Sequence, residues 1–306
     1  MSVPVPAIMP SMPKVGFIVN PKGGGGSALA AWERIHETFP EAAGYFTTRP
    51  GDGKAQALLA RSDGCDVVCA VGGDGTVSEV GSALVHTETV LGIIPAGTGN
   101  DYAKSLAIPR DPVEAARMAY GANFRLVDVG KALSHREFVN IAGVGFDAEV
   151  MTRFNSPGLF AKRMPVKVRY YLSILKTFAQ YRGVKAILTI DGEVTVVDNL
   201  LLLAIGCAQF YGAGMHILPM ADLSDGLFDL AWGFDVKLSE LNKLMVLIYK
   251  GEHVDHPNVK FARCKGVVVE TDPETRFHLD GDVTGKSPVT FECVPHALRV
   301  VAGHSE

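Results

Sequence analysis

Three short apolar runs in the first hundred residues each end in a glycine-rich loop, and a helix-like pattern follows each loop. The loops are residues 20–27 (NPKGGGGS), 72–76 (GGDGT) and 95–101 (PAGTGND). Alternating strands and helices predict a parallel sheet with helices on both faces. In such a sheet ligands bind beyond the carboxyl ends of the strands. We therefore expect the three loops to meet at one sheet edge.

The pattern of predicted secondary structure changes near residue 124. Before it, we expect strands at 15–20, 66–71 and 90–95 and helices at 27–39, 52–61, 76–86 and 112–120. After it, we expect a helix at 238–250 and strands at 125–131, 137–142, 185–190, 194–197, 199–206, 227–233, 267–270 and 276–279. Many short strands with turn signals, such as Asp191-Gly192, predict an antiparallel sandwich or barrel.

This change predicts two domains. Residues 14–128 should form an α/β domain, to which 296–306 return, and residues 129–295 should form the β-rich domain. Residues 1–13 contain four prolines and are expected to be a flexible tail.

Composition limits the partners and the compartment. With 306 residues, 47% hydrophobic and 20% charged, the chain can bury sizeable cores. A net charge of −4 gives no overall cationic field, so we expect no nucleic-acid partner. The longest apolar stretch, around 200–205, is far below the ~20 residues that cross a bilayer. Five scattered cysteines without a CxxC pair are typical of reduced thiols in a cytoplasmic protein.

The composition of the three loops predicts a phosphate site. Glycine lets backbone N–H groups approach a polyphosphate, and the helix N-termini that follow add partial positive charge. Lys22 is placed to meet a phosphate, and Asp74 is placed to hold the Mg²⁺ that accompanies it. One such loop is weak evidence, because glycines often only turn a strand into a helix. Three loops at one sheet edge are much stronger evidence.

Two competing motifs fail. Residues 281–287 (GDVTGKS) resemble a P-loop but are one residue short between the glycines, and no helix follows. Residues 143–148 (GVGFDA) fit the dinucleotide fingerprint loosely, without the expected acidic residue about 20 positions on.

The paired stretches GGDGTVSEV (72–80) and GIIPAGTGNDYAKSL (92–106) strongly resemble the diacylglycerol kinase catalytic domain, which sphingosine, ceramide and bacterial lipid kinases share. The resemblance covers nearly the whole chain, through IVNPKGGGG (18–26), TTRPGD (47–52), LVDVGK (126–131), SDGLFDL (224–230), KGEHVDHPNV (250–259) and HLDGD (278–282). It implies an α/β nucleotide-binding domain like that of NAD kinase and phosphofructokinase, followed by an antiparallel β-sandwich.

The resemblance implies ATP- and Mg²⁺-dependent transfer of the γ-phosphoryl group to the hydroxyl of a lipid, either diacylglycerol or a sphingoid or other lipid alcohol. Asn20, Thr47, Gly73, Thr76, Gly97 and Thr98 fall on the family's nucleotide-binding positions. With the remaining loop residues, the expected cofactor-binding set is Asn20, Lys22, Thr47, Gly72, Gly73, Gly75, Thr76, Gly97, Thr98, Gly99 and Asn100.

Catalytic and metal roles follow from the same resemblance. Asp74 falls on the family's Mg²⁺-binding and catalytic aspartate, and Asp128 on an aspartate of an Asp–water–Mg²⁺ network. Asp225, with the carbonyls of Asp222 and Leu227, falls on a structural Mg²⁺ site.

The general base is less clear. Bacterial diacylglycerol kinases use the Glu of an Asp-Gly-Glu turn, whereas residues 280–282 are Asp-Gly-Asp. An alcohol acceptor must lose a proton, so Asp282 is the expected base and Asp74 is its rival.

Several alternatives stay open. Residues 161–185 carry seven Lys or Arg and no acidic residue. They predict either an amphipathic helix on an anionic membrane, at the inner face of the cell membrane, or a helix packed on the sandwich with solvated lysines. A kinase of a soluble substrate such as NAD, or a non-catalytic nucleotide-binding regulator, would also fit GGDGT alone. The sequence does not name the lipid, and a homodimer is neither required nor excluded.

Overall fold

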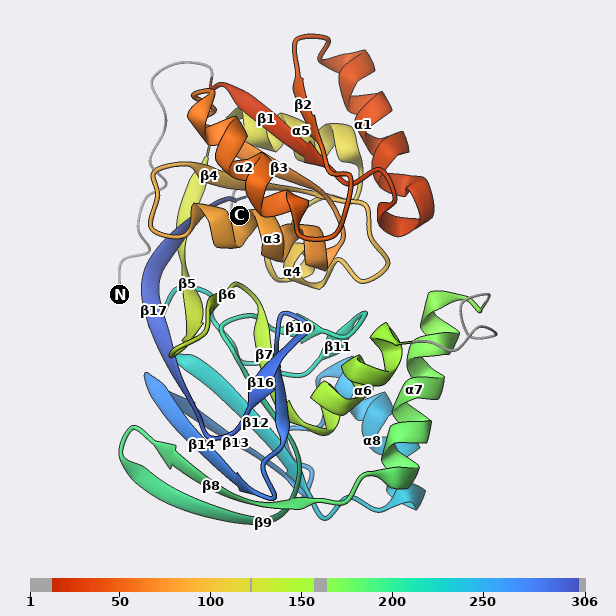
Figure 1. Cartoon of the computed structure of the whole chain (residues 1–306), viewed down its shortest axis with the longest axis vertical. Helices are drawn as coiled ribbons and strands as arrows, with labels where there is room; N and C mark the ends of the chain where they lie inside the picture. The colour runs from red at the N-terminus through yellow and green to blue at the C-terminus, as the bar shows by residue number, and fades with distance from the viewer. Residues whose placement is uncertain (1–12, 122, 157–163, 303–306) are drawn as a thin grey trace. The chain divides into compact units, whose positions relative to one another are not determined.

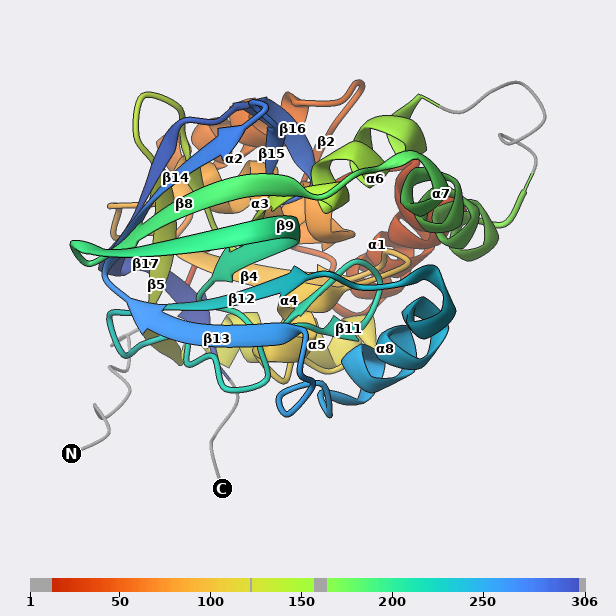
Figure 2. The ribbon, with the colours of Figure 1, turned by 90° about the horizontal axis from the view of Figure 1, so that it is seen from below.

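The computed structural model describes residues 13–121, 123–156 and 164–302, and the chain divides into two compact units (Figures 1 and 2). The first unit contains Met1–Val129 and Pro295–Glu306, and the second contains Gly130–Val294. Two strands, β5 (Phe124–Ala132) and β17 (Val289–Val301), carry the chain from one unit to the other.

The sheet of the first unit is parallel. Its strands lie in the order β4 (Val90–Pro95), β3 (Val67–Gly72), β1 (Val15–Val19), β2 (Ala43–Phe46), and each neighbouring pair is parallel. Every residue of β1 and β3 is buried. Strands buried on both faces are expected to be apolar throughout, and this explains why both appear in the sequence as continuous apolar runs.

Helices cover both faces of this sheet. They are α1 (Ser27–Thr38), α2 (Asp52–Ser62), α3 (Asp74–Leu84), α4 (Asp101–Ser105) and α5 (Pro112–Gly121), with a 3₁₀ turn η1 (Gly23–Gly26). On one face the ring of Phe17 lies 5.7 Å from that of Trp32 in α1 and 6.2 Å from that of Tyr120 in α5. On the other face Gly16 lies against Ala60 of α2. The predicted α/β architecture is confirmed.

The second unit is built from antiparallel strands. They are β6 (Glu137–Phe138), β7 (Ile141–Gly145), β8 (Val184–Ile190), β9 (Glu193–Gly206), β10 (Phe210–Tyr211), β11 (Met215–His216), β12 (Phe228–Phe234), β13 (Val259–Cys264), β14 (Gly266–Asp272), β15 (Arg276–Leu279) and β16 (Asp282–Lys286).

One long strand organises these pairings. The order is β16-β15-β7-β9-β8-β14, and β12 also pairs with β9 and with β13. The first half of β9 pairs with β8, whereas residues 202–206 pair with β7 on one side and β12 on the other. The core between the strands is mostly aliphatic and contains ring contacts: the rings of Phe138 and Phe228 lie 6.0 Å apart, and those of Phe277 and Phe291 lie 5.8 Å apart. The predicted antiparallel sandwich is confirmed.

Three helices pack on this unit: α6 (Phe146–Asn155), α7 (Val166–Gln180) and α8 (Leu238–Lys250). Ile174 of α7 is buried in one cluster with Phe146 and Val150 of α6. In the described part of the chain no helix is long and apolar enough to cross a bilayer.

The structure differs from the sequence prediction at several elements. Strand β2 was not expected, because a four-residue edge strand carries little apolar pattern. Helix α3 begins at Asp74, two residues before the predicted start, so the last three residues of GGDGT are already helical. Helix α6 was missed because its first residues looked like part of a glycine-rich loop. The strand predicted at 137–142 is divided into β6 and β7, and β9 replaces the two strands predicted at 194–197 and 199–206.

Candidate active site

A cavity of about 490 Å³ lies within the first unit, where the loops after β1, β2, β3 and β4 meet. Eight residues of the predicted nucleotide-binding set line it: Asn20, Lys22, Thr47, Gly73, Gly75, Thr76, Gly97 and Thr98. Gly72, Gly99 and Asn100 do not line it. The structure thus brings most of the predicted residues together at one sheet edge.

Two of the glycines are required by close contacts. A Cβ placed on Gly97 would lie 2.3 Å from Cα of Gly73, closer than such atoms can approach, so this glycine lets the backbones of two loops pass against each other. A Cβ on Gly72 would lie 2.5 Å from Oγ1 of Thr76, so this glycine makes room for a side chain of its own loop. Both glycines therefore have a packing role.

Asn100 closes the third loop on itself. Its Oδ1 accepts a hydrogen bond from the Gly97 N–H at 2.8 Å, and its Nδ2 donates to the Gly97 carbonyl at 3.0 Å. It adopts φ +53°, a left-handed conformation that Asn tolerates better than most residues. Asn100 therefore shapes the loop instead of lining the cavity. Asn20 lines the cavity and also donates to Oγ1 of Thr76 at 3.3 Å.

Asp74 lies between two lining residues and holds the second and third loops together. Its Oδ1 accepts hydrogen bonds from the backbone N–H groups of Asp101, at 2.6 Å, and Tyr102, at 3.2 Å. Burial, together with the nearby charge of Asp101, raises the pKa of Asp74 to about 6, although the backbone donors oppose that shift. Asp101 is itself buried and pairs with Lys104 at 2.9 Å. The carboxylates of Asp74 and Asp101 therefore lie close together, and Lys104 is paired with Asp101.

The proximity of these two carboxylates suits a divalent cation beside Asp74, because a cation would offset their repulsion and the desolvation of Asp74. Among the described residues no group of three or more His, Cys, Asp or Glu side chains is placed to hold a metal. Mg²⁺ commonly binds one or two carboxylates and completes its shell with substrate phosphates and water. Asp74 would be the protein ligand in such an arrangement.

Glu79 is a site residue that the sequence prediction missed. Its carboxylate accepts hydrogen bonds from the N–H groups of Gly51, at 2.9 Å, and Gly53, at 2.8 Å, so it fixes the loop carrying Thr47 to helix α3. Asp52 stiffens the same loop: its Oδ2 accepts from the N–H and hydroxyl of Thr48 at 2.9 and 2.6 Å, which holds the pKa of Asp52 below its usual range. The sequence carries no signal for this role, because the contacts of Glu79 with Gly51 and Gly53 arise only when α2 packs against α3.

Asp128 is fully buried in β5, and its Oδ1 accepts a hydrogen bond from the His296 N–H at 2.8 Å. This contact fastens the returning segment of the chain within the first unit. The predicted role of Asp128 in a Mg²⁺-linked network stays a prediction.

In the second unit, Asp280 and Gly281 form a tight turn between β15 and β16. Both have positive φ, +51° and +89°, as a two-residue hairpin turn requires. The Asp280 carboxylate accepts the N–H groups of Val139, at 3.0 Å, and Asn140, at 2.9 Å. Asp282 follows the turn with its side chain 76% exposed, and its Oδ2 lies 3.1 Å from Nη2 of Arg136. Asp280 is thus a structural anchor, and Asp282 is the carboxylate available to solvent.

The predicted structural metal site lies in the loop before β12. Oδ1 of Asp225 accepts the Leu227 N–H at 3.0 Å, and Oδ1 of Asp222 accepts the Ser224 N–H at 2.9 Å. Arg263 forms an ion pair with Asp225 and lies 3.6 Å from the buried Asp229. Since the guanidinium already supplies positive charge to these carboxylates, the chain's own residues do not call for an ion. The Mg²⁺ site at Asp222, Asp225 and Leu227 stays a prediction.

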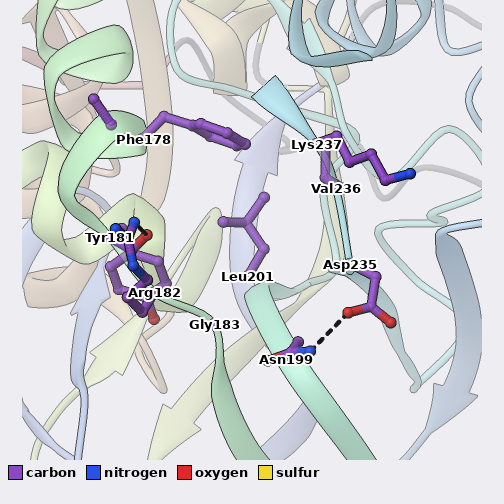
Figure 3. Close-up of a pocket in the computed structure, with 10 residues that line it drawn as sticks. Phe178, Tyr181, Arg182, Gly183, Asn199, Leu201, Asp235, Val236 and Lys237 are labelled. Carbon is purple, nitrogen blue, oxygen red and sulfur yellow. Dashed lines mark hydrogen bonds between the residues drawn. The ribbon is translucent and has the colours of Figure 1, made fainter. Parts of the chain in front are cut away.

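A second cavity, of about 610 Å³, lies in the second unit where α7 ends and α8 begins (Figure 3). Phe178 and Leu201 extend toward its interior, and Asn199 donates a hydrogen bond to Asp235 at 2.8 Å. No glycine-rich strand end lines it. The larger of the two cavities therefore lacks the features of a phosphate site, and the smaller one has them.

The close approach of the glycine loops generates a prediction. Gly97→Ala should push the loop away from Gly73 and weaken nucleotide binding by about tenfold or more, which is ~1.4 kcal/mol. Isothermal titration with a non-hydrolysable ATP analogue would measure this. Gly121→Ala, at a helix end with no atom within 4 Å of the added Cβ, is the matched control and should bind normally. Wild-type affinity in Gly97→Ala would show that the loops do not need this contact.

Comparison with known proteins agrees with this geometry. A family model described as the diacylglycerol kinase catalytic domain matches residues 14–132. A second, described as the YegS C-terminal NAD kinase beta sandwich-like domain, matches residues 140–302. The two matches divide the chain between the α/β part and the β-rich part.

Curated relatives match over most of the chain. A diacylglycerol kinase of Mycobacterium tuberculosis is 34% identical over 298 residues, covering 94% of each chain. One of Staphylococcus saprophyticus is 32% identical over 253 residues, covering 82% of this chain and 81% of its own.

Solved structures share the fold. A diacylglycerol kinase from Bacillus anthracis superposes with a TM-score of 0.72 at 24% identity, covering 95% of this chain and 97% of that one. Another structure from the same organism reaches a TM-score of 0.78 at 26% identity, covering 96% and 97%. With relatives above 30% identity along nearly its whole length, the chain belongs to the diacylglycerol kinase catalytic-domain family and is a lipid kinase.

Proposed function

We propose that this lipid kinase transfers the γ-phosphoryl group of Mg²⁺-bound ATP to the free hydroxyl of a diacylglycerol. The observation that carries the nucleotide half is the cavity in which glycine loops from several strand ends meet beside Asp74. The lipid half rests on the names of the relatives, which are diacylglycerol kinases. A sphingoid base or another lipid alcohol is the alternative acceptor.

The site suits phosphoryl transfer because this reaction needs positioning and charge neutralisation more than covalent chemistry. Backbone N–H groups of the glycine loops and the ammonium group of Lys22 would bind the phosphate oxygens. A Mg²⁺ ion held by Asp74 would supply further positive charge to those oxygens. Asp74 also orients helix α4 through its hydrogen bonds to Asp101 and Tyr102, so one carboxylate would connect the loop geometry to the ion.

The acceptor hydroxyl must also lose its proton. Asp282 is exposed, whereas both oxygens of Asp280 already accept backbone N–H groups. Asp282 is therefore the better base of the two, and Arg136 orients its carboxylate through a contact of 3.1 Å.

The test is an assay of phosphate transfer from radiolabelled ATP to a panel of lipids: diacylglycerol, monoacylglycerol, sphingosine, ceramide and phosphatidylglycerol, with NAD as the soluble acceptor. We expect diacylglycerol to be labelled fastest. Asp74→Asn should lower kcat by about 10²–10³-fold, the size expected for a key electrostatic group. Glu37→Gln, on the exposed face of α1, is the control and should keep full activity.

Three outcomes of this assay would count against the proposal. Unchanged turnover of Asp74→Asn at saturating Mg-ATP would remove Asp74 from the site. Faster labelling of sphingosine or ceramide would change the acceptor, and labelling of NAD alone would indicate a soluble substrate.

A separate prediction concerns Asp282. Asp282→Asn should reduce kcat by about 10²–10⁴-fold, the usual contribution of a positioned base, with the KM for ATP near wild type. Asp282→Glu restores the family's usual residue and should keep activity. Glu274→Gln, an exposed carboxylate at the opposite end of β15 from the turn, is the matched control. A fall of less than about fivefold in Asp282→Asn would transfer the role of base to Asp74.

We also propose that helices α7 and α8 meet an anionic membrane. Ile174 turns into the core, but Val168 and Tyr171 of α7 and Val246 and Tyr249 of α8 are exposed. The two helices are joined by a hydrogen bond of 3.0 Å from Tyr171 to Asn242. Exposed cations lie on or beside the same helices, namely Lys176, Arg182, Lys243 and Lys250. Lys162 and Arg163, part of the predicted basic segment, lie outside the described residues.

This surface gives a testable expectation. Changing Lys176, Arg182 and Lys243 together to Gln should weaken binding to phosphatidylglycerol vesicles, because each basic residue near such a surface contributes about 1 kcal/mol. The salt dependence of binding should flatten too. Lys54→Gln, Arg61→Gln and Arg117→Gln together, at exposed positions of α2 and α5, are the charge-matched control. Sedimentation with vesicles measures both the strength of binding and its salt dependence. If neither salt nor the substitutions change the binding, the membrane role is wrong and α7 is an ordinary solvent-exposed helix.

A further inference from the structure

A buried pair of ionisable side chains lies beneath the turn that carries Asp282. Nε2 of His278 lies 3.3 Å from Oδ2 of Asp147, and their side chains are only 3% and 7% exposed. This carboxylate oxygen is buried and accepts no hydrogen bond within the described ranges, so its contact with the imidazole is one of charge and proximity. The pair comes from two elements, because Asp147 starts helix α6 and His278 belongs to β15.

Gly143 makes room for the pair. It is paired with His278 across β7 and β15, and a Cβ added to it would lie 1.9 Å from Oδ2 of Asp147 and 2.5 Å from Nε2 of His278. Any other residue at this position would displace one of the two side chains. The space for an Asp–His contact is therefore built into the strand.

The opposite side of the imidazole reaches the turn. Nδ1 of His278 accepts a hydrogen bond from the Gly281 N–H at 3.2 Å. A ring nitrogen that accepts carries no proton, so the proton of a neutral imidazole is on Nε2, facing Asp147. The negative charge of the nearby carboxylate favours this tautomer, which is the one that can hold the turn.

Two further contacts fix the rest of the turn. Asp280 accepts two backbone N–H groups through its carboxylate. Arg136 donates to the Leu279 carbonyl at 2.9 Å and to Asp282 at 3.1 Å. Gly281, the residue directly before Asp282, is held by His278.

We propose that the Asp147–His278 pair is a positioning device for Asp282. The pair holds the Gly281 N–H and thereby sets the direction in which the next carboxylate leaves the turn. His278 is not itself a base, because Nδ1 accepts from Gly281 and Nε2 faces a carboxylate, which leaves no lone pair for a substrate proton. The catalytic consequence rests on the proposed role of Asp282.

Two substitutions separate the two contacts of His278, one with the Gly281 N–H and one with Asp147. In His278→Asn, the amide oxygen takes nearly the place of Nδ1 and can still accept the Gly281 N–H, although the contact with Asp147 is lost. In His278→Phe, a ring remains but the acceptor is gone. Hydrogen exchange of the Gly281 amide, followed by NMR in the full chain, reports the turn directly. We expect exchange about tenfold faster or more in His278→Phe, and close to wild type in His278→Asn.

Kinetics report the consequence. His278→Phe should lower kcat by about tenfold to 10²-fold, the cost of misplacing a reacting group, with the KM for ATP unchanged, and His278→Asn should recover most of the loss. In an Asp282→Asn background His278→Phe should cost no more than about twofold further, because the two act through one group. A structural role alone would lower activity equally in both backgrounds.

The outcomes distinguish this proposal from the function on which it rests. Unchanged exchange at Gly281 in His278→Phe, or a full additional loss of kcat in the Asp282→Asn background, would overturn the positioning role. Fast exchange at Gly281 together with a silent Asp282→Asn would confirm that the pair holds the turn and refute Asp282 as the base. If His278→Phe unfolds at a much lower temperature than the wild type, His278→Asn, which loses only the contact with Asp147, is the deciding variant. A loss of kcat in His278→Asn with normal exchange at Gly281 would contradict the proposal.

Discussion

The first unit depends on the contact between two backbones at the ends of β3 and β4. Gly73 and Gly97 approach so closely that no Cβ fits between them, and Asp74 adds hydrogen bonds to Asp101 and Tyr102 across the same junction. Because β3 and β4 are adjacent parallel strands, their loops would meet in any case. The glycines let them meet without a gap, and Asp74 fixes their relative direction.

The same junction brings two carboxylates close together. Asp74 and Asp101 are both largely removed from water, and burial raises the pKa of Asp74 to about 6. Lys104 forms an ion pair with Asp101 at 2.9 Å. Burying two carboxylates side by side costs free energy through desolvation and mutual repulsion. A cation bound there would offset this cost and would also attract both carboxylates. Backbone N–H groups in the surrounding loops then suit the phosphates that accompany such an ion.

Much of this could be predicted from the sequence, and the failures have physical reasons. The strands β1, β3 and β4 and the loops after them were predictable because buried parallel strands are continuous apolar runs and their ends carry glycine. The role of Glu79 was not, because its contacts to Gly51 and Gly53 depend on how α2 and α3 pack. His278 and Asp147 are 131 residues apart in the sequence, and only the pairing of β15 with β7 brings them together.

If Asp282 is the base, as proposed, tertiary contacts at the Asp-Gly-Asp turn compensate a local change. An aspartate at 282 reaches one methylene less far than the glutamate that the family resemblance implies, so a small error in its direction would matter more. In this chain the turn is held at successive positions, by Arg136 at Leu279, by backbone N–H groups at Asp280 and by His278 at Gly281. A shorter side chain on a more rigid support can place its carboxylate as well as a longer one on a looser support, because fewer of its torsions remain free to misdirect it.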